Sequence, residues 1–319
     1  MSEFDLIQRF FTRPTPSATL GVGDDAALLH VAEGMELAVS TDMLVSGTHF
    51  LPDTDPFLLG HKTLAVNLSD LAAMGAAPRW ATLALSLPGA DEAWLQQFSA
   101  GFFYLAGEHG VELIGGDTTR GPLNLCVTIM GEVPHGRALR RSGAQVGDDI
   151  WVSGTLGEAA LGLAHLQGKI ALPEHERASC LDALHRPQPR VALGLALRGI
   201  ANSAIDVSDG LLADLGHILE CSGVAAEVRY DKLPMPSLFA SGDKEMQELA
   251  QRCVLAGGDD YELCFTAPVA QRDRVDMLAD RLHQPLSRIG KIVSGKGCKV
   301  RAADGSVMTI KEGGYDHFA

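Results

Sequence analysis

The stretch Asn202–Leu212 reads NSAIDVSDGLL and predicts a strand that leads directly into a helix. The strand is expected over 203–207 and the helix over 210–221. Two acidic residues, Asp206 and Asp209, stand at the junction between them. Outward from this junction, strands and helices alternate through the second half of the chain. Such a mixture favours an α/β or α+β domain.

The rest of the second half extends this pattern. Strands are expected over 149–153, 226–230, 261–267 and 287–293, with helices over 157–167, 191–201, 243–254 and 270–283. Residues 170–190 are expected to be irregular because Pro187 and Pro189 interrupt them.

The first half carries a second mixture of helices and strands. Helices are expected near the N-terminus and over 58–74 and 92–108, with strands over 36–41, 80–87, 111–114 and 123–133. A basic run over 135–141 separates the halves. We therefore expect an N-terminal domain over 1–137 and a C-terminal domain over 138–319, in keeping with the size of ordinary domains.

Composition excludes several classes of protein. The 319 residues carry a net charge of −14, and 46% of them are hydrophobic, so the chain is neither disordered nor a basic nucleic-acid binder. The six cysteines have no C-x-x-C spacing, which suits buried free thiols. The acidic N-terminus lacks the pattern of a signal peptide, and no charge-free stretch is long enough to span a bilayer. These features predict a soluble cytoplasmic protein.

Acidic residues recur beside glycines and at strand ends. Gly21–Ala26, GVGDDA, fits a dinucleotide fingerprint only literally, and a polar turn or a metal site is the alternative. Ser40, Thr41 and Asp42 end a strand, and the triplet is as well explained by a helix cap or turn as by a set of ligands. Asp70 belongs to an otherwise apolar helix that also carries Asn67. A charge in such a helix is costly unless it is paired or bound to a metal ion. The alternative is that Asp70 lies on a solvated face of the helix.

Two further glycine-rich stretches carry carboxylates. Gly115–Gly121, GGDTTRG, is expected to follow a buried strand, where free amides could cradle a phosphate. Gly257–Glu262, GGDDYE, precedes another strand. At the strand-to-helix junction, Asp206 and Asp209 suit a hard cation, although Asp209 could equally cap the helix that follows. Together these turns offer hard oxygen ligands and no zinc-like cluster, which indicates Mg²⁺ and phosphoryl transfer or phosphate-ester chemistry. The chain has no P-loop.

The same stretches resemble the thiamine-monophosphate kinase family, within the superfamily of aminoimidazole ribonucleotide synthetase. The resemblance runs nearly from end to end. The stretches Ser40–Phe50, STDMLVSGTHF, and Gly314–Phe318, GYDHF, single out the thiamine branch. The glycine-aspartate stretches are shared by the whole superfamily. Asp259 stands where the family usually has glutamate.

The resemblance implies transfer of the γ-phosphate of ATP to thiamine monophosphate, without a phosphoenzyme and with several Mg²⁺ ions. It also implies a homodimer in which the N-terminal domains share a β-barrel with outer helices, while a C-terminal α+β domain completes the active site. Positions matching Mg²⁺ ligands are Asp25, Ser40, Thr41, Asp42, Asp70, Asp117, Asp206 and Asp209. Positions matching ATP contacts are Gly116, Asp117, Arg141 and Ser208, with Arg141 also stabilising charge. Positions matching thiamine contacts are His49, Asp259 and Tyr315.

Two alternatives remain open at this stage. One is an ATP-dependent synthetase of the same superfamily, although the reactive N-terminal cysteine of selenophosphate synthetases is missing, since the first cysteine is Cys126. The other is a non-catalytic protein that binds divalent cations. The GGDTTRG stretch and Arg141 speak against it, because a metal buffer needs neither phosphate-binding amides nor a guanidinium.

Overall fold

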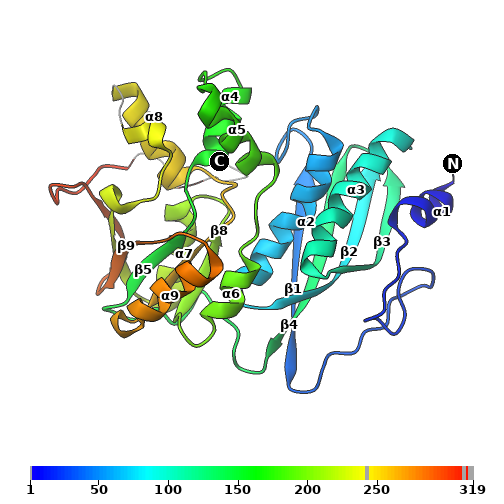
Figure 1. Ribbon diagram of the computed structural model, residues 1–319, viewed down its shortest axis with the longest axis horizontal. Helices are drawn as coiled ribbons and strands as arrows, with labels where there is room; N and C mark the ends of the chain where they lie inside the picture. The colour runs from blue at the N-terminus through cyan, green and yellow to red at the C-terminus, as the bar shows by residue number, and fades with distance from the viewer. Residues whose placement is uncertain (1, 241–243, 311–313, 315–319) are drawn as a thin grey trace. The chain divides into compact units, whose positions relative to one another are not determined.

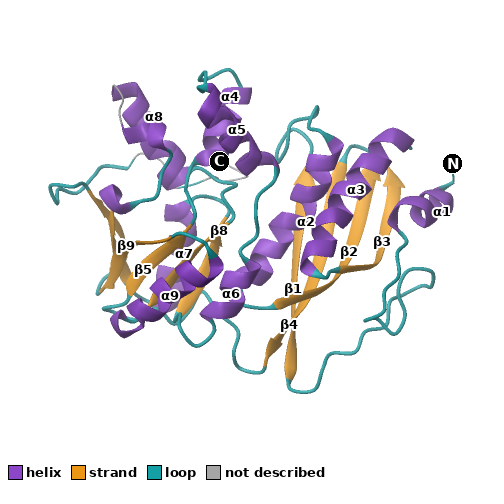
Figure 2. Ribbon diagram, in the orientation of Figure 1, coloured by secondary structure: helices purple, strands orange, loops and turns teal. Residues whose placement is uncertain are grey.

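A computed structural model describes residues 2–240, 244–310 and 314 (Figure 1). The chain divides into two compact units. The first comprises Met1–Leu71 and Ala76–Gly136, and the second comprises Ala72–Gly75 and Arg137–Ala319. Each unit contains one β-sheet with helices packed on it (Figure 2).

The first unit is built on a four-stranded sheet of order β1-β4-β2-β3. Its strands are β1 (Met35–Val45), β2 (Ala77–Leu87), β3 (Glu112–Arg120) and β4 (Asn124–Pro134). Its helices are α1 (Glu3–Leu6), the π-helical turn η1 (Ile7–Phe11), α2 (Pro56–Ala73) and α3 (Glu92–His109). β4 pairs antiparallel with β1 and β2, whereas β2 and β3 are parallel and are connected through α3. A parallel pair requires such a crossover.

Helices α2 and α3 pack closely against each other and lie against the sheet in Figure 2. A Cβ atom at Gly60 of α2 would lie 2.0 Å from the Phe98 carbonyl oxygen, and one at Gly101 of α3 would lie 1.9 Å from the Phe57 carbonyl oxygen. The two glycines therefore let the helix backbones touch. α3 begins at Asp91, whose side chain accepts hydrogen bonds from the amides of residues 93 and 94, and it ends at Gly110 in the left-handed conformation.

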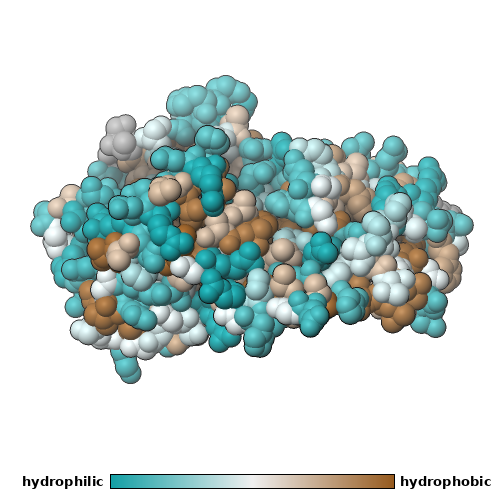
Figure 3. Space-filling view, turned by 60° about the horizontal axis from the view of Figure 1, so that its bottom comes forward, coloured by the Kyte–Doolittle hydropathy of each residue, from teal (hydrophilic) through white to brown (hydrophobic). Residues whose placement is uncertain are grey.

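Strand β1 alternates between a side that faces α2 and a side that remains exposed. The exposed row contains Met35, Leu37, Val39 and Met43, which are 39%, 41%, 56% and 53% exposed. Side chains on alternate positions of a strand share one face, so these residues form one apolar strip. On the face of the molecule drawn in Figure 3, hydrophobic residues (brown) lie among hydrophilic ones (teal).

The second unit is built on a six-stranded sheet of order β10-β7-β9-β5-β8-β6. Its strands are β5 (Asp149–Ser153), β6 (Ser203–Val207), β7 (Ala225–Arg229), β8 (Glu262–Ala267), β9 (Leu286–Val293) and β10 (Gly297–Arg301). Its helices are α4 (Glu158–Leu166), α5 (Glu174–His185), α6 (Val191–Leu197), α7 (Leu211–Ser222), α8 (Lys244–Ala256) and α9 (Arg272–Leu282), with short 3₁₀ turns at η2 (Tyr230–Lys232), η3 (Ser237–Ala240) and η4 (Val269–Gln271).

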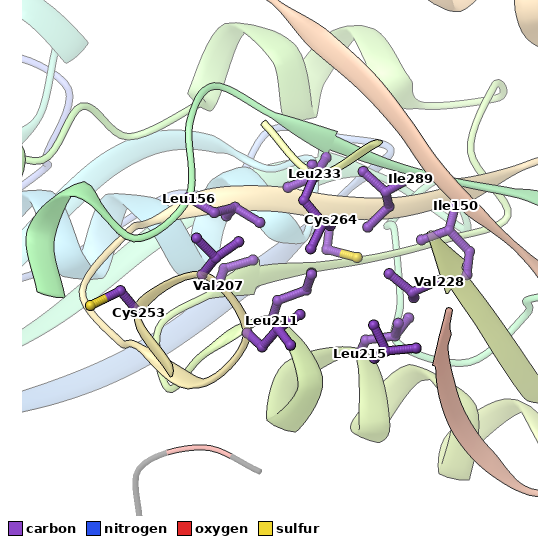
Figure 4. Close-up of a cluster of buried hydrophobic side chains, with 14 of the residues drawn as sticks. Ile150, Leu156, Val207, Leu211, Leu215, Val228, Leu233, Cys253, Cys264 and Ile289 are labelled. Atoms are coloured by element: carbon purple, nitrogen blue, oxygen red, sulfur yellow. The ribbon is translucent and has the colours of Figure 1, made fainter. Parts of the chain in front are cut away.

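This second sheet is buried on both faces along its β5-β8-β6 end. Every residue of β5, β6 and β8 is buried. On one face, Ile150 and Cys264 belong to a core that includes Leu211 and Leu215 of α7 (Figure 4). Neighbouring strand positions point to the other face, where the rings of Trp151 and Phe265 stack 6.4 Å apart. The second unit therefore completes a hydrophobic core around these strands.

Most expected elements are present, with three differences. Residues 170–190 are not wholly irregular, because α5 forms within them and packs on α4. β10 was not expected. β3 continues to Arg120, so the GGDTTRG stretch lies mostly inside a strand rather than in a turn after it. Among the described residues, none of the helices combines the length and apolar composition needed to cross a membrane.

Candidate functional site

In the first unit, β1 and α2 bring together three of the expected metal ligands. The Ser40 hydroxyl donates a short hydrogen bond to a carboxylate oxygen of Asp70. Two residues further along β1, the Asp42 amide donates to the side-chain oxygen of Asn67 over 3.2 Å. Ser40 and Asp42 share a face because strand side chains alternate. Asp70 therefore belongs to the sheet-facing side of α2, and its reading as part of a solvated face is wrong.

Thr41 faces the opposite side of β1. Its hydroxyl lies 2.9 Å from the Thr128 hydroxyl on β4. A strand cannot direct three consecutive side chains to one point, because successive side chains point to opposite faces. The side chains of Ser40, Thr41 and Asp42 consequently do not form one ligand set, although residue 41 can still contribute backbone atoms to the face of its neighbours.

Gly116 and Asp117 lie on β3, away from the residues of β1. β3 is separated from β1 by two intervening strands, which places the strands about 14 Å apart at ordinary sheet spacing. A Cβ atom at Gly116 would lie 1.9 Å from the Leu83 carbonyl oxygen of β2. The need for glycine at residue 116 thus follows from strand packing, whereas Asp117 is exposed.

The Gly21–Ala26 stretch forms a turn with backbone hydrogen bonds between Leu20 and Leu28 on either side of it. No helix follows, so the dinucleotide fingerprint lacks its structural context. Within the turn, the Asp24 carboxylate accepts a hydrogen bond from the Asp25 amide over 2.9 Å. Asp24 therefore stabilises the turn, and Asp25 is exposed.

His49 lies just beyond the end of β1 and is half-buried. Its Nδ1 atom accepts a hydrogen bond of 3.0 Å from the Val45 amide. When the ring is neutral, the proton therefore resides on Nε2. This hydrogen bond from a residue four positions earlier fixes the orientation of the His49 ring.

In the second unit, the strand-to-helix junction holds Asp206, Ser208 and Asp209. Asp206 is 4% exposed, whereas the other two are half-buried. The amides of Ser208 and Asp209 both donate to one oxygen of Asp214, over 3.0 and 3.1 Å. Burial raises the pKa of Asp214 to about 7, although these amides partly oppose the shift.

The GGDDYE segment packs directly on this junction. The amides of Asp259 and Tyr261 donate to the carbonyl oxygens of Ser208 and Val207, over 2.9 and 2.8 Å. Both donating residues have positive φ angles, 70° and 49°, which are strained for residues other than glycine. The Tyr261 hydroxyl in turn donates to the Asp259 carboxylate over 3.1 Å. The segment thus holds Asp259 beside the acidic junction.

Asp260 points the other way and anchors the segment. Both of its carboxylate oxygens accept hydrogen bonds from the Gly157 amide at the start of α4, over 3.0 and 2.9 Å. Burial raises the pKa of Asp260 well above its ordinary value, and the nearby carboxylates of Glu262 and Asp259 add to the effect. Of the adjacent acids, Asp260 therefore stabilises the fold, whereas Asp259 lies beside the junction and accepts the Tyr261 hydroxyl.

Arg141 lies far from Ser208 within the same unit. The Arg141 carbonyl accepts a hydrogen bond of 3.3 Å from Ser222, at the C-terminal end of α7, whereas Ser208 precedes the N-terminal end. A helix of 12 residues is about 18 Å long. These two expected ATP contacts therefore cannot hold the same phosphate group within one unit.

Tyr315 lies outside the described residues. Its neighbour Gly314 is described, and a Cβ atom there would lie 3.1 Å from the Asp209 carbonyl oxygen and 2.5 Å from the Ala213 side chain. Gly314 thus lies beside the N-terminal end of α7.

The described residues contain no cluster of three or more histidine, cysteine, aspartate or glutamate side chains arranged to hold a metal ion. They offer smaller groups of carboxylates and hydroxyls, on β1 with α2 and at the start of α7. Mg²⁺ commonly takes one or two protein carboxylates and fills its other positions with water and phosphate oxygens. The donor set therefore fits Mg²⁺ that arrives with a phosphate-bearing substrate.

Asp214, Asp260 and Tyr261 were not singled out from the sequence. A signal existed for Asp214, since it is an acidic residue within the apolar run Leu211–Ile218, four positions after a glycine. No local pattern distinguishes Asp260 from Asp259 or predicts that the Tyr261 hydroxyl contacts its neighbour.

Comparisons with known proteins agree with this arrangement. Residues 23–133 match the N-terminal domain of AIR synthase related proteins, and residues 145–303 match the C-terminal domain. The chain is 51% identical to the thiamine-monophosphate kinase of Escherichia coli O157:H7, over 99% of this chain and 98% of that one.

Two solved structures are also similar. The thiamine-monophosphate kinase of Stenotrophomonas maltophilia K279a has a TM-score of 0.85 and 52% identity, covering 96% of each chain. A structure of AaThiL complexed with AMPPCP and TMP has a TM-score of 0.76 and 30% identity, covering 99% of this chain and 96% of that chain.

Proposed function

The chain belongs to the AIR synthase related proteins and, among them, to the thiamine-monophosphate kinase family, and from this premise we propose that it phosphorylates thiamine monophosphate with ATP. The near-complete coverage of a relative at 51% identity supports the reaction. AMPPCP is an ATP analogue whose γ-phosphate cannot be transferred, so the AaThiL complex with AMPPCP and TMP supports both substrates. The contact between Ser40 and Asp70, which gathers hard oxygen donors on β1 and α2, is the observation in this chain that carries the proposal.

Each unit contributes donors suited to Mg²⁺. In the first unit, Ser40, Asp42 and Asp70 would hold it, with further positions predicted at Asp25, residue 41 and Asp117. In the second unit, Asp206 and Asp209 would hold it. When bound, Mg²⁺ would screen the repulsion between two anionic substrates and stabilise charge on the transferring group. An acidic protein can bind phosphates in this way.

The transfer itself needs little from the side chains beyond orientation. An oxygen of thiamine monophosphate attacks the γ-phosphorus of ATP, the bond from that phosphorus to the bridging oxygen breaks, and ADP leaves with the electron pair. The acceptor oxygen is already anionic, so no general base is required. No phosphoenzyme forms, and the products are thiamine diphosphate and ADP.

Three residues are proposed for the thiamine substrate. His49, whose Nδ1 is engaged by the Val45 amide, can donate from Nε2 to an anionic group. Asp259 supplies a carboxylate that favours the cationic thiazolium ring, and the Tyr261 hydroxyl helps to orient it. Tyr315, predicted from the tail, lies outside the described residues and remains a predicted contact. Gly116, Asp117, Ser208 and Arg141 remain predicted ATP contacts.

The exposed strip on β1 supports a homodimer. Met35, Leu37, Val39 and Met43 present large apolar side chains along one strand. Contiguous apolar surface of this kind commonly marks a protein interface. A second copy that packs its own strip here would bury these side chains, and two such sheets would form the shared β-barrel. We place the protein in the cytoplasm, where its six free cysteines would remain reduced.

Acceptor-dependent release of ADP tests the proposed function. With ATP and MgCl₂ present, thiamine monophosphate should stimulate ADP release, whereas free thiamine should not, because it lacks the attacking phosphate oxygen. ADP release that is equal with and without thiamine monophosphate would overturn the choice of acceptor.

A further inference from the structure

Backbone amides at the start of α7 converge on a side chain of the same helix. The amides of Ser208 and Asp209 donate to Asp214 over 3.0 and 3.1 Å, and the Gly210 amide interacts with the same carboxylate. Asp214 is only 3% exposed and lies one turn into the helix. When Asp214 is ionised, its negative charge lies against the positive end of the helix dipole.

This contact changes what the junction can bind. A glycine-containing turn from a strand into a helix usually offers its amides to a phosphate or another anion. Here the carboxylate of Asp214 already occupies them. The junction also carries the side chains of Asp206, Ser208 and Asp209, whose oxygens favour a cation rather than an anion.

The opposite side of the same junction is fixed by the Gly257–Tyr261 segment. The carbonyl oxygens of Val207 and Ser208 accept hydrogen bonds from the amides of Tyr261 and Asp259. Gly210, with φ of +116°, packs so closely on Ala256 that a Cβ atom would lie 2.7 Å from its carbonyl carbon. The carbonyl side of the junction is thus held by one segment, and its amide side is held by Asp214.

We propose that Asp214 is a positioning residue that occupies the amides of residues 208–210 and thereby keeps Asp206 and Asp209 oriented to bind Mg²⁺. The inference rests on the proposed function, because that function supplies the metal. Loss of the acceptor would leave buried amides unsatisfied, and the junction would have to rearrange to hydrate them. Residues that orient metal ligands typically contribute 10- to 100-fold to metal affinity.

The test measures Mg²⁺ binding directly, as the rise in melting temperature during titration of the full-length chain with MgCl₂ in the presence of AMPPCP. Four variants are compared: Asp214→Ala, Asp214→Asn, Asp214→Glu and Glu220→Gln. The last is a matched control, because Glu220 is an exposed acid on the same helix. The Asn variant keeps an oxygen acceptor in place, and the Glu variant keeps the charge but displaces it by one methylene.

We expect Asp214→Ala and Asp214→Glu to weaken the apparent Mg²⁺ affinity by about 10- to 100-fold. Asp214→Asn should stay within about threefold of the parent chain, because its amide oxygen can still accept both hydrogen bonds. The control should match the parent. If Asp214→Ala does not fold, Asp214→Glu carries the test.

Unchanged Mg²⁺ affinity in the Ala or Glu variant would overturn the inference, and so would an equal loss in the Asn variant. Product formation by the parent chain is measured separately. Thiamine diphosphate production with unchanged Mg²⁺ affinity in Asp214→Ala would refute only the role of Asp214. Weakened Mg²⁺ affinity in that variant, without thiamine diphosphate production by the parent, would refute only the proposed function.

Discussion

The two sheets of this chain differ in how they are covered. In the second unit, every residue of β5, β6 and β8 is buried, and both faces of the sheet carry packed side chains. In the first unit, β1 alternates between a side that faces α2 and an exposed apolar side. The second unit therefore completes its own core, whereas the first leaves an exposed apolar strip on β1, onto which we propose that a second copy packs.

The largest expected effect comes from removing one proposed metal ligand in either unit. Asp42→Asn and Asp209→Asn should each lower turnover by about a thousandfold, since loss of metal-assisted charge stabilisation removes several kcal/mol. Melting temperatures should change little, because both carboxylates are half-exposed. Asp182→Asn, an exposed acid on α5, is the control. Full activity with normal Mg²⁺ dependence in both variants would remove the assignment.

A charge in the exposed strip should separate the two copies. Val39→Glu would bury a carboxylate in the proposed interface, which is unfavourable unless the charge is paired. Its molar mass in solution, measured by light scattering, should fall to that of a monomer. Met277→Glu changes a side chain that is 68% exposed on α9 and should not alter the mass. A dimer that survives Val39→Glu would place the interface elsewhere.

Truncation of one leucine in each unit compares a side chain buried within its own unit with one exposed on the strip of β1. Leu215→Ala should lower the free energy of unfolding by about 2–5 kcal/mol at any protein concentration, because Leu215 is fully buried within its own unit. The stability lost in Leu37→Ala should depend on protein concentration, because its burial requires association. Urea unfolding at two concentrations distinguishes these cases. A concentration-independent loss in Leu37→Ala would argue against association through β1.

Buried Asp214 in the second unit should make the stability of the folded chain depend on pH. Burial raises the pKa of Asp214 from its ordinary value of 3.8 to about 7 in the folded chain, so folding favours its protonated form. Its contribution to stability is present at low pH and is lost as pH rises from about 4 to 7. Asp214→Asn cannot ionise, so without metal its melting temperature relative to the parent should increase across this range. A difference that is constant with pH would show that Asp214 does not titrate there.

The smallest effect is expected at Tyr261. Tyr261→Phe removes only the hydroxyl that donates to Asp259, and a hydrogen bond of this kind is worth about 1 kcal/mol. The KM for thiamine monophosphate should rise about fivefold, with kcat and the KM for ATP nearly unchanged. An increase in the KM for ATP instead would place Asp259 near the nucleotide.

Regular periodicity made much of the fold predictable. The helix expected over 58–74 is α2, Pro56–Ala73, and the strand expected over 203–207 is β6. α5 was missed because its sequence is mostly polar and is flanked by prolines, and it buries only a few side chains against its surroundings. The end of β3 was misjudged because its glycines suggested a turn, whereas Gly116 is required by the backbone of β2.

The site was less predictable than the fold because it depends on contacts across the chain. The sequence placed Ser40 and Asp70 among the candidates, and their contact joins residues 30 positions apart. The strand expected over 36–41 already implies that Thr41 faces away from Ser40, because strand side chains alternate. Nothing in the sequence indicated that Arg141 lies at the opposite end of α7 from Ser208, or that Asp214 occupies the amides of the junction. Both depend on how segments distant in the sequence are placed by the fold.

The fate of the γ-phosphate tests whether it is transferred directly from ATP to thiamine monophosphate. The chain is incubated with ATP labelled in its γ-phosphate, MgCl₂ and thiamine monophosphate, and the thiamine esters are separated from nucleotide and protein. We expect the label in the terminal phosphate of thiamine diphosphate, with an equal amount of ADP and no label on the protein. Label found only in inorganic phosphate, or retained on the protein, would contradict direct transfer to thiamine monophosphate.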